Sequence, residues 1–363
     1  MGFSAEDHGL MARAISLTAR GRDTATPNPS VGCVIARSGR ILGEGWHEKA
    51  GEAHAEARAL ASCAGEASGA TVYLTLEPCA HQGRTGPCVD ALIAARVGRV
   101  VAALEDPNPL VSGKGFARLR DAGIAVDVGL MAAEATQAHR GFLARMRRGR
   151  PWLRIKAAAS LDGRTALGDG RSRWITGPDA RRDVHALRAR SCAMVTGIGT
   201  VLADDPQLTV RDVPCLRQPR RAVIDSRLET PPEAKILGGG GTILFAANEA
   251  PDRQRALEAK GAKVIQVPGP GGKTDLAEVA RHLGSLGFNE VTVESGAKLH
   301  ASLIQAGVVD ELVLYLSPKL LGNTAAGLFA LPGLGSLDEA LQPRIVDVRQ
   351  VGADLRITAY LER

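Results

Sequence analysis

Aromatic residues make up only 3% of this chain of 363 residues. Proteins that read single-stranded nucleic acid stack its bases on aromatic rings, so this scarcity argues against that class. No apolar run reaches the roughly 18 residues that a membrane-spanning helix needs, and no basic-then-apolar segment opens the chain. We therefore expect a cytoplasmic protein with no membrane partner.

Cysteine is also scarce, with six residues in the whole chain. In a reducing compartment, cysteine pairs are more often metal ligands than disulfides. Four of the six lack ligand spacing and lie in apolar or mixed contexts, which is typical of packing residues. These four are Cys33, Cys63, Cys192 and Cys215.

The length suggests two domains, because a single domain usually has roughly 100–200 residues. A composition of 45% hydrophobic and 23% charged residues is typical of globular proteins. The net charge of +6 permits nucleic acid, an anionic membrane or a phosphorylated small substrate as partner. The tightest basic cluster, residues 145–150, falls near the expected domain junction, and we interpret it as a solvated linker face rather than a polyanion patch.

Apolar periodicity and turn residues predict a mixed sheet covered by helices over residues 1–147. The expected strands are 31–36, 41–46, 71–76, 100–103 and 124–128, and the expected helices are 5–21, 54–64, 88–95, 116–122 and 130–148.

The pattern restarts at Pro151 and predicts an α/β domain of largely parallel strands over residues 148–363. The expected strands are 153–159, 193–196, 222–224, 242–246, 263–267, 290–294 and 311–316, and the expected helices are 179–190, 252–260, 276–286 and 299–305. Residues 344–351 and 355–360 read as a terminal antiparallel hairpin.

One imidazole and two thiolates are placed like the ligands of a catalytic zinc. His54 opens a predicted helix, and Cys79 and Cys88 lie at the end of a strand and the start of the next helix. Three protein ligands leave the fourth zinc position open for water. Glu56 is two residues from a ligand, so it can shuttle a proton without binding the metal. This pattern is typical of zinc deaminases that act on nucleobase-type amines.

The loop between Cys79 and Cys88 is longer than the two residues usual for zinc deaminases. Its side chains include His81 and Arg84, which suit a substrate larger and more anionic than a bare base. His81 is also an alternative fourth ligand, which would make the zinc structural.

Together, residues 26–32 (Thr-Pro-Asn-Pro-Ser-Val-Gly), 54–56, 77–79, 81–88 and 106–109 (Asp-Pro-Asn-Pro) resemble the bifunctional riboflavin-biosynthesis deaminase/reductase family. The resemblance implies a cytidine-deaminase fold in the first half. It implies that this half replaces the 2-amino group of 2,5-diamino-6-ribosylamino-4(3H)-pyrimidinone 5′-phosphate by oxygen. One departure is Gly86, where the family loop commonly has proline.

The resemblance also implies that Asn28, His81 and Arg84 contact the base or its ribose phosphate. A turn between two prolines is an equally good explanation of Asn28.

Motifs of the second half, around residues 156–164, 172–177, 197–206 and 294–299, are weak when taken singly. In particular, Gly197-Ile198-Gly199 is not a complete dinucleotide fingerprint. As a set they resemble the reductase half of the same family, which implies a dihydrofolate-reductase-like α/β fold and NADPH as cofactor. The implied reaction delivers hydride to C1′ of the ribosyl group and gives 5-amino-6-ribitylaminouracil 5′-phosphate.

The same resemblance assigns residues to the cofactor and the substrate. NADPH would contact Ala158, Trp174, Thr200, Asp204, Ser226, Gly296, Ala297, Lys298, Leu299, His300, Ala301 and Ser302. The substrate would contact Ser172, Arg188, Leu208, Arg211 and Glu294. Arg188 and Arg211 suit a 5′-phosphate, because guanidinium groups bind phosphate oxygens bidentately.

Two other interpretations stay open at this point. One is an editing deaminase whose basic second domain holds a polynucleotide, and the other is a zinc-stabilised domain without catalysis. We expect a homo-oligomeric enzyme that uses zinc and NADPH, acts on a phosphoribosylated pyrimidine and has no nucleic-acid partner.

Overall fold

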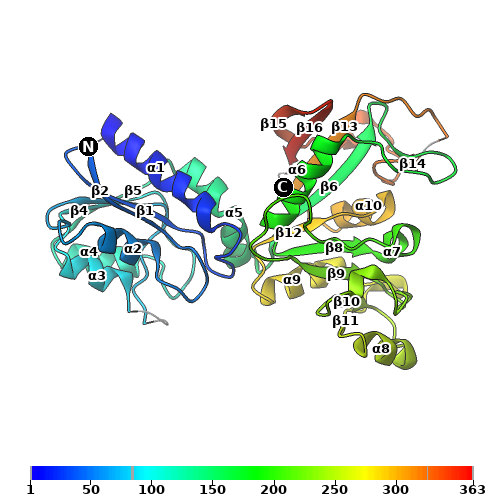
Figure 1. The fold of residues 1–363 in the computed structure, drawn as a ribbon, viewed down its shortest axis with the longest axis horizontal. Coiled ribbons are helices and arrows are strands. Elements are labelled where there is room, and N and C mark those ends of the chain that lie inside the picture. The colour runs from blue at the N-terminus through cyan, green and yellow to red at the C-terminus, as the bar shows by residue number, and fades with distance from the viewer. Residues whose placement is uncertain (1, 83–85, 325, 362–363) are drawn as a thin grey trace. The chain divides into compact units, whose positions relative to one another are not determined.

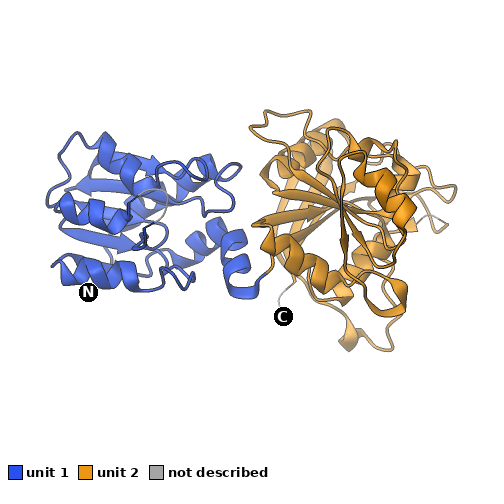
Figure 2. Cartoon of the chain, turned by 90° about the horizontal axis from the view of Figure 1, so that it is seen from below, with its two compact units in different colours: residues 1–149 blue, residues 150–363 orange. Residues whose placement is uncertain are grey.

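The computed structural model describes residues 2–82, 86–324 and 326–361, and the chain divides into two compact units, residues 1–149 and 150–363 (Figure 2). The expected boundary between residues 147 and 148 would cut the last turn of a helix that runs to Arg148. That helix ends at Gly149, which has a left-handed φ of 66°. Glycine tolerates this conformation and commonly ends helices.

The first unit is a five-stranded sheet in the order β2-β1-β3-β4-β5 (Figure 1). Strand β1 is antiparallel to β2 and β3, whereas β3, β4 and β5 are parallel, so the predicted mixed sheet is confirmed. The strands are β1 (Gly32–Arg37), β2 (Arg40–Trp46), β3 (Thr71–Leu74), β4 (Arg99–Ala102) and β5 (Ala125–Val128). The helices are α1 (Ala5–Gly21), α2 (Ala55–Ser62), α3 (Cys88–Ala94), α4 (Lys114–Asp121) and α5 (Ala132–Arg148).

Helices cover both faces of this sheet (Figure 1). Helices α1 and α5 pack with one set of alternating strand residues, including Val34 and Tyr73. Helices α2, α3 and α4 pack with the other set, including Ile35 and Leu74. Alternation along each strand therefore builds two apolar layers, with the sheet between them.

The second unit is built on a nine-stranded sheet in the order β11-β10-β9-β8-β12-β6-β13-β16-β15. The strands from β11 to β13 are parallel, and β16 and β15 form the predicted terminal hairpin. The strands of this sheet are β6 (Trp152–Ser160), β8 (Ala193–Gly197), β9 (Arg220–Ile224), β10 (Ile243–Ala246), β11 (Lys263–Gln266), β12 (Glu290–Val293), β13 (Glu311–Ser317), β15 (Arg344–Val351) and β16 (Asp354–Tyr360). Strands β7 (Arg164–Ala166) and β14 (Ala326–Gly327) form a separate small ribbon.

One face of the large sheet carries α6 (Pro178–Arg190), α7 (Ile198–Asp204) and α8 (Pro251–Glu258). The other face carries α9 (Leu276–Ser285) and α10 (Ala297–Gln305). Helix α7 was not predicted from the sequence. No helix in the described part of the chain has the length and apolar content to cross a membrane.

Candidate active sites

His54, Cys79 and Cys88 lie together in the first unit. His54 caps the start of α2, and Cys88 is the first residue of α3. The Nδ1 atom of His54 is 3.5 Å from Cys79 Sγ and 3.3 Å from Cys88 Sγ, and all three ligand atoms lie within 4.8 Å of one another. These donors fit zinc, which prefers nitrogen and sulfur ligands in a tetrahedral arrangement.

His81 is not a member of this cluster among the residues that the structure describes. Three protein ligands leave one tetrahedral position open, as in catalytic zinc sites and unlike structural ones. The geometry therefore favours a catalytic metal over a merely stabilising one.

The two thiols are electrostatically coupled. Hydrogen bonds from Cys88 lower the pKa of the Cys79 thiol, with a further contribution from His54, and Cys79 in turn raises the pKa of Cys88. The backbone N–H of Cys88 also donates to Cys79 Sγ at 3.4 Å. The site is therefore prepared to hold one thiolate, and a divalent metal bound there would favour the thiolate form of both cysteines.

Glu56 lies in the first turn of α2 and is buried. Burial raises the pKa of its carboxyl group above the usual range, and the charge of Cys79 adds to this effect. A carboxylate with a raised pKa is suited to accept and return a proton near neutral pH.

A cavity of about 510 Å³ opens beside these residues and is lined by His54, Glu56 and Cys79. This volume is typical of small-molecule sites. Two predicted substrate contacts, Asn28 and His81, also line it, whereas Arg84 lies outside the described residues. Asn28 is connected to the metal ligands, since its Nδ2 is 3.1 Å from Nε2 of His47 and the His47 and His54 rings meet edge to face at 5.1 Å.

Glu77 fixes the segment that leads to the metal ligand Cys79. Its carboxylate accepts N–H groups at 2.9–3.3 Å from the turn and helix start that follow β4, namely Asp106, Gly113, Gly115 and Phe116. These bonds attach the segment before Cys79 to α4.

The basic cluster at residues 145–150 is not uniformly a solvated linker face. Arg147 and Arg148 are exposed, as expected. Arg145 instead lines the cavity, and Arg150 forms a largely buried ion pair with Asp310 at 2.7 and 3.0 Å. The interpretation was wrong for Arg150, because packing buries most of its side chain, and Arg145 forms part of a cavity wall as well as of the linker face.

In the second unit, most of the predicted cofactor and substrate residues follow adjacent parallel strands. Helix α7 follows β8, α10 follows β12, and Ser226 follows β9. The carboxyl ends of parallel strands meet at one edge of a sheet, where α/β proteins bind their ligands. Two observations show that these segments are close together. The start of α7 lies against α10, since a Cβ added at Gly197 would be 3.0 Å from the Leu299 side chain. The segment that holds Trp174 lies against the end of α7, since Arg173 donates to the carbonyl of Asp204 at 2.9 Å.

This edge fits a dinucleotide phosphate group. Gly197 and Gly296 are the N-cap residues that precede α7 and α10, and neither helix start is capped by a side chain. Such starts offer backbone N–H groups to anions. The hydroxyls of Thr196 and Ser295 are buried here without a hydrogen-bond partner in the described part of the chain.

Not all predicted cofactor residues point outward. His300 and Ala301 are buried on α10, and Ser302 donates its hydroxyl to the carbonyl of Lys298. The Oγ of Ser226 accepts the N–H of Thr274 at 3.1 Å. Trp174 is largely exposed, with the guanidinium of Arg181 4.6 Å from its ring centroid.

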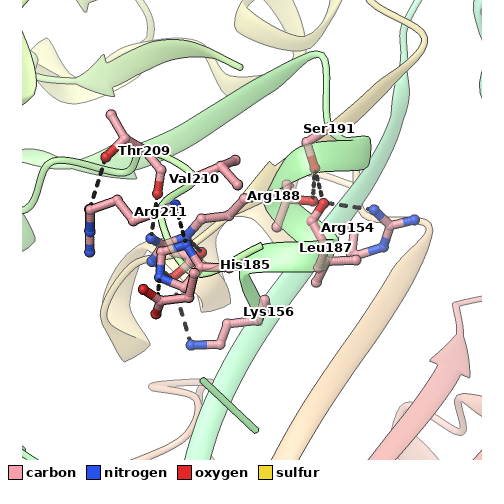
Figure 3. Close-up of polar contacts among 12 residues, drawn as sticks. Arg154, Lys156, His185, Leu187, Arg188, Ser191, Thr209, Val210 and Arg211 are labelled. Atoms are coloured by element: carbon pink, nitrogen blue, oxygen red, sulfur yellow. Dashed lines mark hydrogen bonds and ion pairs between the residues drawn. The ribbon is translucent and has the colours of Figure 1, made fainter. Parts of the chain in front are cut away.

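A polar network joins three of the predicted substrate residues, Arg188, Glu294 and Arg211 (Figure 3). No polar contact in the described part of the chain adds Ser172 or Leu208 to it. Arg188 on α6 donates to both carboxylate oxygens of Glu294 and to the carbonyl of Thr209. Lys156 Nζ lies 3.6 Å from Glu294. The positive charges of Arg188 and Lys156 outweigh the effect of burial and hold the pKa of Glu294 at about 2, so its carboxyl group is anionic.

Arg211 has a different environment. Its exposed guanidinium contacts the hydroxyl of Thr209 at 2.9 Å (Figure 3). The guanidinium also contacts Gln207 at 3.1 Å, and the backbone N–H of Arg211 donates to His185 Nδ1. Leu208 is buried in the same segment with φ of 51°. Arg211 can therefore reach a phosphate, whereas Arg188 is engaged by Glu294.

The folds and sites define a zinc deaminase joined to a reductase. Residues 4–104 match the family model of the cytidine and deoxycytidylate deaminase zinc-binding region, and residues 151–357 match that of the RibD C-terminal domain. The riboflavin biosynthesis protein RibD of Escherichia coli is 49% identical over 96% of this chain and 98% of its own length. The RibD of Haemophilus influenzae is 46% identical over 98% of each.

Solved structures agree with these similarities. Acinetobacter baumannii RibD superposes with a TM-score of 0.91 at 39% identity over 99% of both chains. A Thermotoga maritima structure, described as a diaminohydroxyphosphoribosylaminopyrimidine deaminase/5-amino-6-(5-phosphoribosylamino)uracil reductase, gives 0.87 at 30% identity over 98% of this chain and 99% of that one.

The chain belongs to the RibD family of riboflavin biosynthesis proteins. It is a bifunctional enzyme with a cytidine-deaminase-like first domain and a dihydrofolate-reductase-like second domain, and it uses zinc and NADPH.

Sequence reasoning missed several residues of both sites. His47, Asp106 and Arg145 line the deaminase cavity, and Lys156 contacts Glu294. For Lys156 a usable signal existed, since it lies within the strand that begins the reductase motif. Asp106 opens the Asp-Pro-Asn-Pro motif and Arg145 opens the basic cluster, but neither pattern indicates a place in the cavity. His47 carries no local pattern, and only packing brings it to the cavity.

Proposed function

We propose that the first unit deaminates 2,5-diamino-6-ribosylamino-4(3H)-pyrimidinone 5′-phosphate and that His54, Cys79 and Cys88 hold its zinc. Zinc in a three-ligand site activates water for attack at neutral pH. Glu56 would accept a proton from the attacking water and deliver it to the ring nitrogen. It would then carry the proton of the newly added hydroxyl group to the amine, which leaves as ammonia. The observation that carries this proposal is the buried Glu56 in the same cavity as a three-ligand metal cluster.

Asn28, His81 and Arg84 are proposed to contact the substrate in this first site. Support for Asn28 and His81 comes from their place in the cavity wall. The role of Arg84 remains a prediction from the resemblance.

For the second unit we propose reduction of the ribosyl group to ribityl, with NADPH as the hydride donor. The N–H groups at the starts of α7 and α10 would hold the cofactor, together with Ala158, Trp174, Asp204 and Ser226. Thr200 lies in α7, Gly296 is the N-cap residue of α10, and residues 297–302 lie within α10.

On the substrate side of this unit, Arg211 is proposed to bind the 5′-phosphate. Ser172 and Leu208 would complete the pocket. Arg188 and Glu294 would present a fixed carboxylate to the ribose hydroxyl groups, because their ion pair holds both side chains in place.

We also infer a cytoplasmic homo-oligomer. All six cysteines are free of disulfides, in keeping with a reducing compartment. Ile345, Val348 and Leu355 on the β15–β16 hairpin expose 61%, 56% and 40% of their surfaces, and apolar groups gathered in this way favour association with a second copy. Sedimentation of the purified protein tests the oligomeric state.

The central experiment mixes the protein, zinc and the diaminopyrimidine phosphate and follows ammonia with and without NADPH. We expect ammonia in both mixtures and NADPH oxidation only after deamination. Glu56→Gln should retain zinc and lose ammonia release. Ammonia release at the wild-type rate by this variant would refute the role of Glu56.

A further inference from the structure

The cavity beside the metal ligands has a cationic side that no motif explains. Among the described residues that line it, only Arg145 carries a permanent positive charge. Four carboxylate residues also line it, namely Glu52, Glu56, Glu77 and Asp106. Because like charges repel, an anionic group that enters this cavity is drawn toward Arg145 and away from these residues.

Arg145 is positioned by contacts within its own unit. Its Nη2 donates to the carbonyl of Pro27 at 2.7 Å, and its guanidinium carbon lies 5.8 Å from the ring centroid of Phe142. Phe142 also lines the cavity and is three residues earlier on α5, so both side chains project from the same helix face. A guanidinium carries five N–H donors in a planar fork, and a bond to one carbonyl orients the fork that recognises an oxyanion.

A short series of contacts connects Arg145 with the metal ligands. Pro27, which accepts from Arg145, precedes Asn28, whose side chain contacts His47 at 3.1 Å. The ring of His47 in turn packs edge to face against that of His54. Arg145 is therefore separated from the zinc ligand by a turn and one imidazole ring, which suits a substrate whose anion is remote from its reacting amine.

We propose that Arg145 binds the 5′-phosphate of the deaminase substrate and so selects phosphorylated over unphosphorylated pyrimidines. This inference rests on the proposed function of the first site. The proposal divides the basic cluster at residues 145–150 into two parts. Its first residue, Arg145, belongs to a binding site, whereas Arg147, two residues later, lies on the surface.

A purely structural role for Arg145 makes a different prediction. If the guanidinium only ties α5 to the carbonyl of Pro27, its loss disturbs every substrate equally. If it binds phosphate, its loss affects phosphorylated substrates alone. The comparison of two substrates therefore separates the two roles.

The experiment measures ammonia release by Arg145→Met, Arg145→Lys and the matched control Arg147→Met in the full-length zinc enzyme. Each is tested with the diaminopyrimidine phosphate and with its dephosphorylated form. We expect Arg145→Met to lower kcat/KM for the phosphorylated substrate roughly 10- to 100-fold, mainly through KM, as for loss of a charged hydrogen-bonded contact. For the dephosphorylated compound its kcat/KM should stay within about threefold of wild type, which is well below that effect. Arg145→Lys should fall between wild type and Arg145→Met, and Arg147→Met should match wild type.

Inorganic phosphate provides a second readout. It should inhibit wild-type deamination of the dephosphorylated compound competitively, roughly tenfold more weakly in Arg145→Met, and to an intermediate degree in Arg145→Lys. Zinc content and NADPH-dependent reductase activity report whether each variant is folded. If Arg145→Met is not folded, the proposal is judged on Arg145→Lys. Equal losses for both substrates, or unchanged phosphate inhibition, would overturn the proposal. Absence of ammonia with the wild-type enzyme would instead refute the proposed function itself.

Discussion

The guanidinium of Arg188 lies against the carboxylate of Glu294, with Nε–Oε1 at 2.6 Å and Nη2–Oε2 at 2.9 Å. Both side chains are 13% exposed, so this is a buried, bidentate ion pair. Lys156 on β6 approaches the same carboxylate. His185 lies one helical turn before Arg188 on α6, and its Nε2 is 3.2 Å from Asp212. The reductase site is therefore organised around one anion that two cations surround.

Replacing Glu294 by glutamine should leave Arg188 and Lys156 facing each other without their anion. Breaking a buried pair on one side typically costs about 3–5 kcal/mol. We expect the second unit to unfold at lower denaturant concentration and reductase kcat to fall at least about tenfold. Ammonia release by the first unit should persist.

A matched control for this change is Arg182→Met on the same helix. Arg182 is 65% exposed and pairs only loosely with Asp179 at 3.4 Å. Loss of such a surface pair should change stability by less than about 1 kcal/mol. If Glu294→Gln is no more destabilising than this control, the pair does not organise the site.

Arg211→Ala tests whether Arg211, and not Arg188, binds the 5′-phosphate of the reductase substrate. Since Arg211 is exposed and Arg188 is engaged by Glu294, removing Arg211 should raise the reductase KM roughly 10- to 100-fold. NADPH affinity, measured by nucleotide titration, should not change. Arg255→Ala on α8, an exposed arginine of another helix, serves as control. A loss of NADPH binding would place Arg211 on the cofactor instead.

Strands and helices of both units were predictable because helices bury one stripe and central strands form short apolar runs, and both patterns are local. The strand expected at 31–36 is β1 at Gly32–Arg37, and the helix expected at 179–190 is α6 at Pro178–Arg190. The short helix α7 was missed because it follows Gly197 and contains Gly199, which lower helix propensity. The burial of Val201 in the core outweighs that local cost.

Site residues divide in the same way. His54, Cys79 and Cys88 were predictable because zinc ligands of these residue types occur in short motifs that can be recognised in the sequence. The pairing of Arg188 with Glu294 was not, because 106 residues separate them. Arg145 approaches Pro27 across 118 residues, and only the packing of α5 on the sheet brings them together.

Gly115 tests how tightly α4 supports the metal site. A Cβ at this position would lie 2.3 Å from the carbonyl of Pro78 and 3.1 Å from the carboxylate of Glu77. We expect Gly115→Ala to push the segment before Cys79, to cost about 1–3 kcal/mol of stability and to weaken zinc binding in a chelator competition.

Gly9→Ala makes the same chemical change in α1, where nothing lies within 4 Å of the added carbon. It should stabilise the protein by about 0.5–1 kcal/mol and leave zinc binding unchanged. Equal zinc affinity in the two variants would show that the close packing of Gly115 has no consequence for the metal.

Asp7 should make the free energy of unfolding of the first unit depend on pH in the acidic range. Burial acts to raise the pKa of this carboxyl group, but hydrogen bonds from the Ser4 backbone N–H, Tyr73 and Arg99 outweigh it and lower the pKa to about 2. An unfolded aspartate titrates near pH 3.9. The stabilisation, on the order of 2 kcal/mol, is therefore complete above about pH 4 and is lost as the pH falls through about 2. Asp7→Asn should be less stable than wild type at pH 7 by roughly this amount in urea unfolding, and the difference should shrink between pH 4 and 2. A difference that stays constant down to pH 2 would show that the carboxylate charge does not stabilise the fold.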